Sequence, residues 1–176
     1  MNTRSYVSIG AMVLVALVLL AGCATTNADG SPKWTTDVPS HWRTYHAVGY
    51  GKLSNVQNSR MRAEAMATDA VARWASVTVQ GALTNYFQDS GSSGNQNLEM
   101  LESISRQVVD ISLRGIQVEE QYTDADGGVW VLVSFPVKNL KDAYKAQSLK
   151  LEREAQIGKA DLLIEYLERE LAKEGK

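Results

Sequence analysis

The chain has 176 residues, of which 44% are hydrophobic and 22% charged, with a formal net charge of −2 at pH 7 and a single cysteine. This length suits one domain with a real core and leaves too few residues for two. The mildly acidic balance argues against a nucleic-acid partner, which selects basic surfaces, and a lone cysteine excludes an internal disulfide.

The N-terminus is organised like a bacterial secretion signal. Residues 1–4 form a short basic segment, residues 7–21 form an apolar run, and Leu20-Ala21-Gly22-Cys23 matches the box at which lipoprotein precursors are acylated and cut. The run is shorter than the ~18 to 20 residues of a spanning helix. We therefore expect a signal peptide over 1–22, cleavage between Gly22 and Cys23, and acylation of Cys23. An uncleaved transmembrane anchor is the alternative.

Acyl chains on Cys23 would hold the mature domain at a bilayer without a spanning helix. Ala24 replaces the aspartate that retains enterobacterial lipoproteins in the inner membrane, so we expect a lipid-anchored, periplasm-facing protein of the outer membrane. The polar run that follows has no apolar period and predicts a flexible tether within residues 23–43. Trp34 and Trp42 flank its end, where they either cap the core or touch headgroups or a partner.

The folded domain is expected over residues 44–137, beginning with a short strand in which Tyr45, Ala47 and Gly49 alternate with His46, Val48 and Tyr50. A helix follows, because Ser54-Asn55-Val56-Gln57 fits a capping box with Ser54 as the cap. Its apolar face recurs every three or four residues, and the helix could persist to about Phe87. The predicted buried positions are Ala63, Ala67, Ala70, Trp74 and Val77.

The polar, glycine-rich run at 89–97 is typical of a mobile loop. A second helix follows, with an end near Gly115 and apolar positions at Leu98, Leu101, Ile104, Val108 and Ile111. Residues 116–123 then alternate, Asp124-Ala125-Asp126-Gly127-Gly128 suits a turn, and residues 129–137 are apolar. This pattern predicts a β-hairpin.

The second strand of that hairpin is apolar on both faces, with Trp130 and Leu132 on the side opposite the valines. Such a strand needs cover on both sides, so either the last helix crosses the Trp130 face or another protein does.

We predict a long amphipathic C-terminal helix over residues 138–176, with Asn139 as its cap. Gly158 could loosen this helix. Its expected apolar positions before Gly158 are Leu140, Ala143, Tyr144 and Leu151. Those around and after Gly158 are Ile157, Ala160, Ile164, Leu167 and Leu171. This second set either docks on the domain or pairs with another protomer.

Catalytic motifs are missing from the sequence. His41 and His46 are the only histidines, and no metalloprotease, nucleophile-elbow or phosphate-loop pattern occurs. We expect a non-catalytic protein that needs no cofactor or metal. Gly49, Gly51 and Ser54, at a strand-to-helix turn, are a candidate anion site, although such a turn needs glycines in any case.

The chain resembles the LPP20 family of bacterial lipoproteins. The resemblance rests on Val48-Gly49-Tyr50-Gly51, on the stripe Ala63, Ala67 and Ala70 leading to Arg73 and Trp74, and on the strand Val129-Trp130-Val131-Leu132-Val133. It implies an α+β fold: a small, mainly antiparallel sheet of about three strands in the order β-α-α-β-β-α, with a long C-terminal helix. It also implies an outer-membrane location and no established reaction, and some members are flagellar lipoproteins in rings around the basal body.

Two functions are compatible with these features. The first is an assembly lipoprotein of the cell envelope, which uses the Trp130 face or the terminal helix to join copies of itself or envelope and flagellar proteins. The second is a periplasmic module that binds a small anionic or glycan ligand near Gly49 to Ser54. Activation of cell-wall synthesis is a third, resting only on location.

Overall fold

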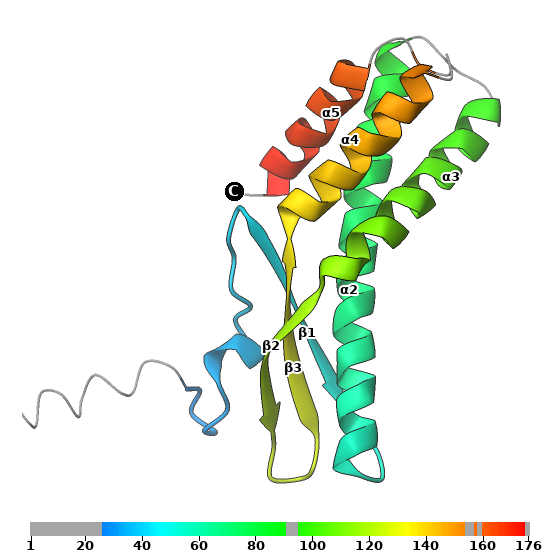
Figure 1. The fold of residues 1–176 in the computed structure, drawn as a ribbon. Helices are drawn as coiled ribbons and strands as arrows, with labels where there is room; N and C mark the ends of the chain where they lie inside the picture. The colour runs from blue at the N-terminus through cyan, green and yellow to red at the C-terminus, as the bar shows by residue number, and fades with distance from the viewer. Residues whose placement is uncertain (1–25, 91–94, 154–156, 158–159, 175–176) are drawn as a thin grey trace, which may run out of the picture. The chain divides into compact units, whose positions relative to one another are not determined.

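The computed structural model describes residues 26–90, 95–153, 157 and 160–174. The chain, drawn in Figure 1, divides into two compact units, Met1–Asp37 and Val38–Lys176. The predicted signal peptide, its cleavage site and the acylation site at Gly22 and Cys23 lie outside the described residues.

The described part of the first unit is locally folded, although we predicted a flexible tether there. The Asn27 side chain donates hydrogen bonds to Ser31 Oγ at 2.9 Å and to the Pro32 carbonyl at 3.1 Å. Asp29 accepts hydrogen bonds from the hydroxyl and the N–H of Ser31, which lower the pKa of the Asp29 carboxyl. A short 3-10 helix, η2 (Lys33–Thr35), follows. Short polar side chains therefore order this segment by bonding to nearby groups.

Three antiparallel strands form the sheet of the second unit: β1 (Thr44–Gly51), β2 (Gln117–Thr123) and β3 (Val129–Pro136). Their order is β1-β3-β2, with β3 in the centre. The predicted hairpin is confirmed. Its turn is closed by Asp124, whose Oδ1 accepts the N–H groups of Asp126 and Gly128, and by Gly127 at φ +79°.

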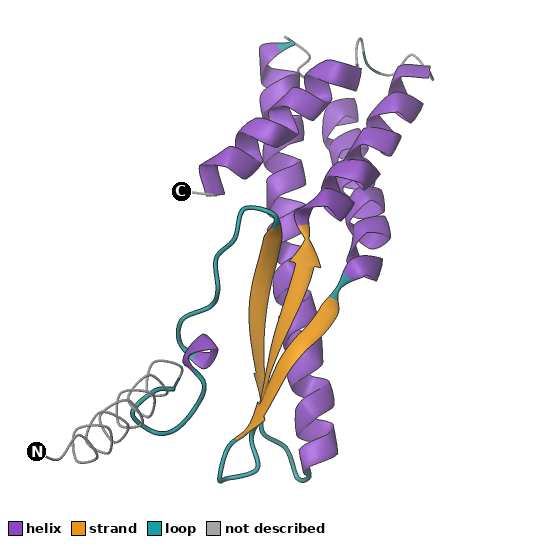
Figure 2. Cartoon of the chain, turned by 60° about the vertical axis from the view of Figure 1, so that its left-hand side comes forward, coloured by secondary structure: helices purple, strands orange, loops and turns teal. Residues whose placement is uncertain are grey.

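Helix α2 (Val56–Asp89) packs along β1 and β3 and continues beyond the sheet into a group of helices (Figure 2). Its cap is Asn55, whose side chain accepts the N–H of Asn58 at 2.8 Å. The prediction of Ser54 as cap is thus wrong by one residue. The extended backbone of Asn55, at φ −146° and ψ 158°, gives its side chain the geometry that an N-cap requires.

The buried side of α2 also differs from the predicted one after Ala67. Ala70 and Trp74 are half-buried, and Val77 is 60% exposed. Buried residues instead recur at every fourth position: Ser59, Ala63, Ala67, Val71, Ala75, Val79 and Leu83. A spacing of four advances about 40° per step around a helix of 3.6 residues per turn. The buried line therefore rotates as α2 passes from the sheet to the helices.

Three further helices complete the unit: α3 (Asn95–Ser112), α4 (Val137–Arg153) and α5 (Ala160–Glu174), with a 3-10 turn, η3 (Leu113–Gly115), after α3. The predicted loop at 89–97 is shorter than expected, since α2 ends at Asp89 and α3 begins at Asn95; residues 91–94 lie outside the described residues. The predicted single C-terminal helix is two helices. Asn139 is not its cap, because α4 begins at Val137, directly after β3.

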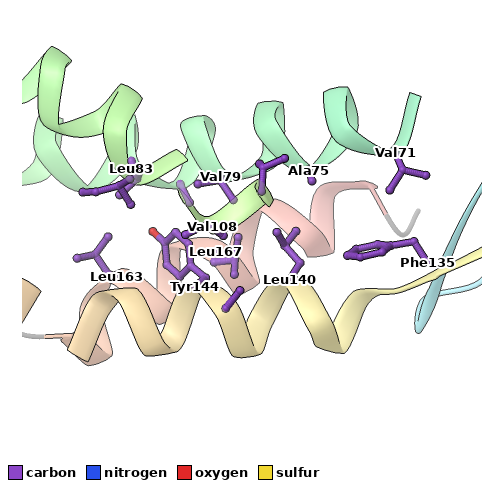
Figure 3. Packing of buried hydrophobic residues seen from close by; sticks show 14 of the residues in the cluster. Val71, Ala75, Val79, Leu83, Val108, Phe135, Leu140, Tyr144, Leu163 and Leu167 are labelled. Atoms are coloured by element: carbon purple, nitrogen blue, oxygen red, sulfur yellow. The ribbon is translucent and has the colours of Figure 1, made fainter. Parts of the chain in front are cut away.

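Helices α2, α3, α4 and α5 enclose a continuous apolar core (Figure 3). The predicted positions on α4 are confirmed as buried: Leu140, Ala143, Tyr144 and Leu151. Burial raises the pKa of Tyr144, whose hydroxyl has no hydrogen-bond partner in the described part of the chain. The fold is therefore the expected α+β class, with a three-stranded sheet backed by one long helix.

Candidate functional site

The glycines of the candidate anion site are used for packing. A Cβ at Gly49 would collide with the carbonyl oxygen of Ala63 and lie 2.7 Å from the Ala67 nitrogen, and one at Gly51 would collide with the Ser59 carbonyl. The strand and the helix thus touch through their backbones. Ser54 is exposed and does not act as the cap. The anion site stays a prediction without geometric support.

Trp130 and Leu132 lie on the sheet face turned away from α2. Trp130 is half-buried, with its ring 4.6 Å from that of Tyr50, and Leu132 is only 2% exposed. The Tyr50 hydroxyl donates to Asp124 Oδ2 at 3.2 Å, and its partial burial and that carboxylate raise the pKa of Tyr50. The last helix does not supply the expected cover, because α5 packs on α2 and α4.

The terminal residues that we proposed as partner contacts belong mostly to the core. Ile157 and Leu167 are buried, and Ile164 and Leu171 are half-buried. Helix α5 is fixed to α2 by Asn85, whose side chain donates to Glu170 at 2.7 Å. Of the two alternatives, α5 therefore docks on its own domain, and its buried residues are not available to a second protomer.

A groove that we did not predict lies beside β1. It has a volume of about 630 Å³ and is lined by the segment 38–42 on one side and by Thr44, Tyr45, His46, Ala47 and Val48 on the other. Ala70 and Trp74 of α2, with Val137 and Leu171, complete its wall. The segment before β1 turns sharply at His41, whose carbonyl accepts the Thr44 N–H at 3.1 Å, and then diverges from the strand (Figure 2).

Aromatic rings dominate this groove. The rings of Tyr45 and Trp74 stack at 4.2 Å with an interplanar angle of 10°, and Phe135 meets Trp74 edge-on at 6.0 Å. Trp42, at the rim, is 70% exposed, and the Arg43 guanidinium lies 4.2 Å above its ring. No Asp, Glu, Lys or Arg side chain is among the residues that line the groove. Its wall is thus largely apolar and aromatic, with a serine, a threonine and two histidines among its lining residues and the Arg43 guanidinium at the rim.

At alternate residues of β1, the backbone N–H and C=O groups point into this groove. The Val137 N–H donates to the Arg43 carbonyl at 2.9 Å, while the Thr44 N–H bonds within the preceding turn. Thr44 faces Pro136, which has no N–H. Since hydrogen-bonded pairs alternate in an antiparallel ladder, Tyr45 and Ala47 bond to β3. The N–H and C=O groups of His46 and Val48 therefore point away from the sheet.

His46 also contributes the only ion-pair candidate of β1. Its Nε2 lies 3.4 Å from Glu119 of β2, reaching across the small Ser134 of the central strand, and its Nδ1 is buried without a hydrogen-bond partner in the parts of the chain described here. Among the described residues, no group of three His, Cys, Asp or Glu side chains is placed to hold a metal ion.

A signal for the groove was present in the sequence. Pro39, His41, Trp42 and Arg43 stand close together directly before a strand that has no Asp, Glu, Lys or Arg. An aromatic ring at the end of a polar linker is a weak signal of a contact surface, and the wall from Ala70, Trp74 and Leu171 depends on tertiary packing.

In the described part of the chain, no helix combines the length and apolar character needed to cross a membrane. A comparison with curated proteins gives no match. The model of the LPP20 lipoprotein family matches residues 32–135, which is more than half of the chain and includes β1, α2 and the hairpin. The chain therefore belongs to the LPP20 lipoprotein family and is a membrane-anchored lipoprotein of the cell envelope.

Proposed function

We propose that this protein is a non-catalytic structural or assembly component of the outer membrane, anchored through acyl chains on Cys23 and facing the periplasm. Its partners are envelope proteins, with the flagellar basal body as one candidate assembly. The observation that carries this proposal is the groove beside β1, where an exposed Trp42, a stacked Trp74 and free strand edge are gathered in one place. Aromatic residues of this kind dominate the energetics of protein interfaces.

The aromatic rim favours a protein over a small ligand as the partner. A small-molecule site buries most of its ligand in a concave pocket with a few convergent polar groups. Here the wall is formed by β1, by the segment 38–42 and by one or two residues from each of α2, α4 and α5, with Trp42 projecting into solvent. This geometry suits a partner that covers the rim as well as the groove.

The test is photo-crosslinking in growing cells, with a photoreactive amino acid in place of Trp42 in the full-length, acylated protein. Because Trp42 is exposed, the replacement should leave the fold intact. Matched controls carry the same group at Val77 on α2 and at Gln121 on β2, both exposed. We expect envelope proteins to be crosslinked to the photoreactive group at position 42 and to neither control position. A Cys23→Ser variant should lose the membrane anchor and those crosslinks.

The proposed function would be contradicted if no protein is crosslinked at position 42, or if the same proteins are crosslinked there as at Val77 and Gln121. Crosslinks between copies alone would replace it with self-assembly. Flagellar proteins in the crosslinked set would identify the assembly, and other envelope proteins would exclude the flagellar candidate.

A further inference from the structure

We infer that the groove receives an extended, acidic segment of the partner protein, which adds as a fourth strand to the free edge of β1. This inference rests on the proposed function and specifies how the partner is recognised.

The two edges of the sheet differ in how they resist strand addition. On β2, the register shifts between Val118 and Glu120, and nearly every residue is exposed, including the adjacent Glu119 and Glu120. A bulge and charged side chains are the usual means by which proteins block edge pairing. Strand β1 pairs with β3 over all eight residues without a bulge and contains no Asp, Glu, Lys, Arg or Pro. Its edge therefore has neither of these two protections.

The backbone geometry of β1 provides the hydrogen-bonding groups for an added strand. His46 and Val48 direct their N–H and C=O groups away from β3, and the sheet has no strand on that side in the described part of the chain. Both residues line the groove. A chain lying about 4.8 Å from β1 would pair with them, as peptides do when they extend an exposed sheet edge.

Alternate side chains of the added strand would meet different surroundings. Those on the α2 side would lie against the stacked rings of Tyr45 and Trp74 and against Leu171, which form an apolar wall. Because side chains alternate between the two faces of a strand, the partner segment should have apolar residues at every second position.

Charge complementarity specifies an acidic residue in that segment. The Arg43 guanidinium lies over the Trp42 ring at the groove rim, and no carboxylate of the described residues forms an ion pair with it. The lining itself has no acidic side chain that would repel an anion. A partner carboxylate beside Arg43 would gain a charge-assisted hydrogen bond, with the guanidinium already oriented by the indole.

The test uses a library of random twelve-residue peptides displayed on phage, selected against the full-length acylated protein in nanodiscs. A synthetic copy of an enriched peptide is then titrated against variants. Val48→Pro removes an outward N–H without removing a bond to β3, and Val48→Thr keeps that N–H with a side chain of similar shape. Gln121→Pro makes the matched change at an outward position of β2.

We expect enriched peptides that alternate apolar and polar residues and carry Asp or Glu. Val48→Pro should weaken binding at least tenfold and Arg43→Gln three- to tenfold, whereas Val48→Thr and Gln121→Pro should bind as the unchanged protein does. Hydrogen exchange should show protection of the His46 and Val48 amides by the peptide, a readout that does not depend on the folding of any variant.

The absence of enriched peptides, full binding by a folded Val48→Pro protein, or protection confined to other amides would overturn the inference. The proposed function is tested independently, because crosslinks at position 42 would still identify an envelope partner. Loss of those crosslinks together with failed peptide selection would remove both.

Discussion

The two edges of the sheet differ in how well they are protected against pairing with another strand. Strand β2 combines a bulge with an exposed, glutamate-rich edge, while β1 is regular, has no Asp, Glu, Lys or Arg, and is bordered by an aromatic groove. Both strands are edge strands of the same three-stranded sheet and both pair with β3, so their position in the sheet does not explain the difference in protection. It follows from which residues each edge contains and from what surrounds it.

The regularity of β1 depends on its contact with α2. Gly49 and Gly51 let the strand approach the helix until backbone meets backbone, and the small residues Ser59, Ala63 and Ala67 leave room on the helix side. Close packing of this kind holds β1 rigid and presents its free edge in one fixed geometry. Preorganisation of this kind lowers the entropic cost of binding.

The largest effect on stability is expected from a substitution that disrupts this packing. Gly49→Ala places a methyl group against the Ala63 carbonyl and the Ala67 nitrogen, neither of which can move as a side chain can. We expect a loss of about 3 kcal/mol in the free energy of unfolding, measured by chemical denaturation. The control is Gly81→Ala, where the new Cβ meets no backbone atom of another element and only the side chain of Glu170, whose nearest atom lies at 3.2 Å. It should be neutral or stabilise α2 by up to about 1 kcal/mol.

Proline substitution tests the backbone alternation of β1. Ala47→Pro removes an N–H that bonds to β3 and should cost about 3 kcal/mol. Val48→Pro removes one that points into the groove and should cost about 1 kcal/mol or less, because edge positions facing solvent tolerate proline. Thermal and chemical denaturation of the two variants give the comparison. Equal losses would show that the alternation is assigned to the wrong residues.

The two tryptophans of the groove should separate folding from binding. Trp74→Ala removes the ring stacked on Tyr45 and should lower the free energy of unfolding by about 2 kcal/mol, less than for a fully buried ring. Trp42→Ala changes an exposed side chain and should stay within about 0.5 kcal/mol. Denaturation curves measure both. A loss above about 1 kcal/mol for Trp42→Ala would mean that this ring supports the fold.

The smallest effect on folding is expected at β2. Glu119→Val removes an exposed charge and the contact with His46, which should change the free energy of unfolding by less than about 1 kcal/mol. The edge loses part of its protection, so self-association should rise. Sedimentation at increasing protein concentration measures this, with Glu102→Val on α3 as the control for lost charge. Equal association by both variants would show that the edge itself plays no part.

Local patterns in the sequence predicted most of the fold. Alternation around the Asp124–Gly128 turn identified the hairpin, and the alanines at positions 63 and 67 identified the buried face of α2 where it meets the sheet. Beyond Ala67 the prediction failed at Val77, because the buried line rotates as α2 enters the helical core. A fixed apolar stripe does not describe a helix with two different sets of neighbours.

The candidate site was harder to predict, because it is built from distant segments. Trp42, His46, Trp74 and Leu171 share one groove only after α2 and α5 pack together. The predicted contacts Ile157 and Leu167 were apolar for a different reason, since they fill the core. An amphipathic helix has the same pattern whether its apolar face meets its own domain or a partner.

The proposed strand addition requires that the free edge of β1 is occupied in the cell. Hydrogen exchange of the His46 and Val48 amides tests it, comparing the acylated protein in isolated cell envelopes with the same protein purified into nanodiscs, with Gln121 as the internal reference. We predict slow exchange at both β1 amides in envelopes, fast exchange after purification, and no change at Gln121. Fast exchange at His46 and Val48 in both preparations would contradict the claim.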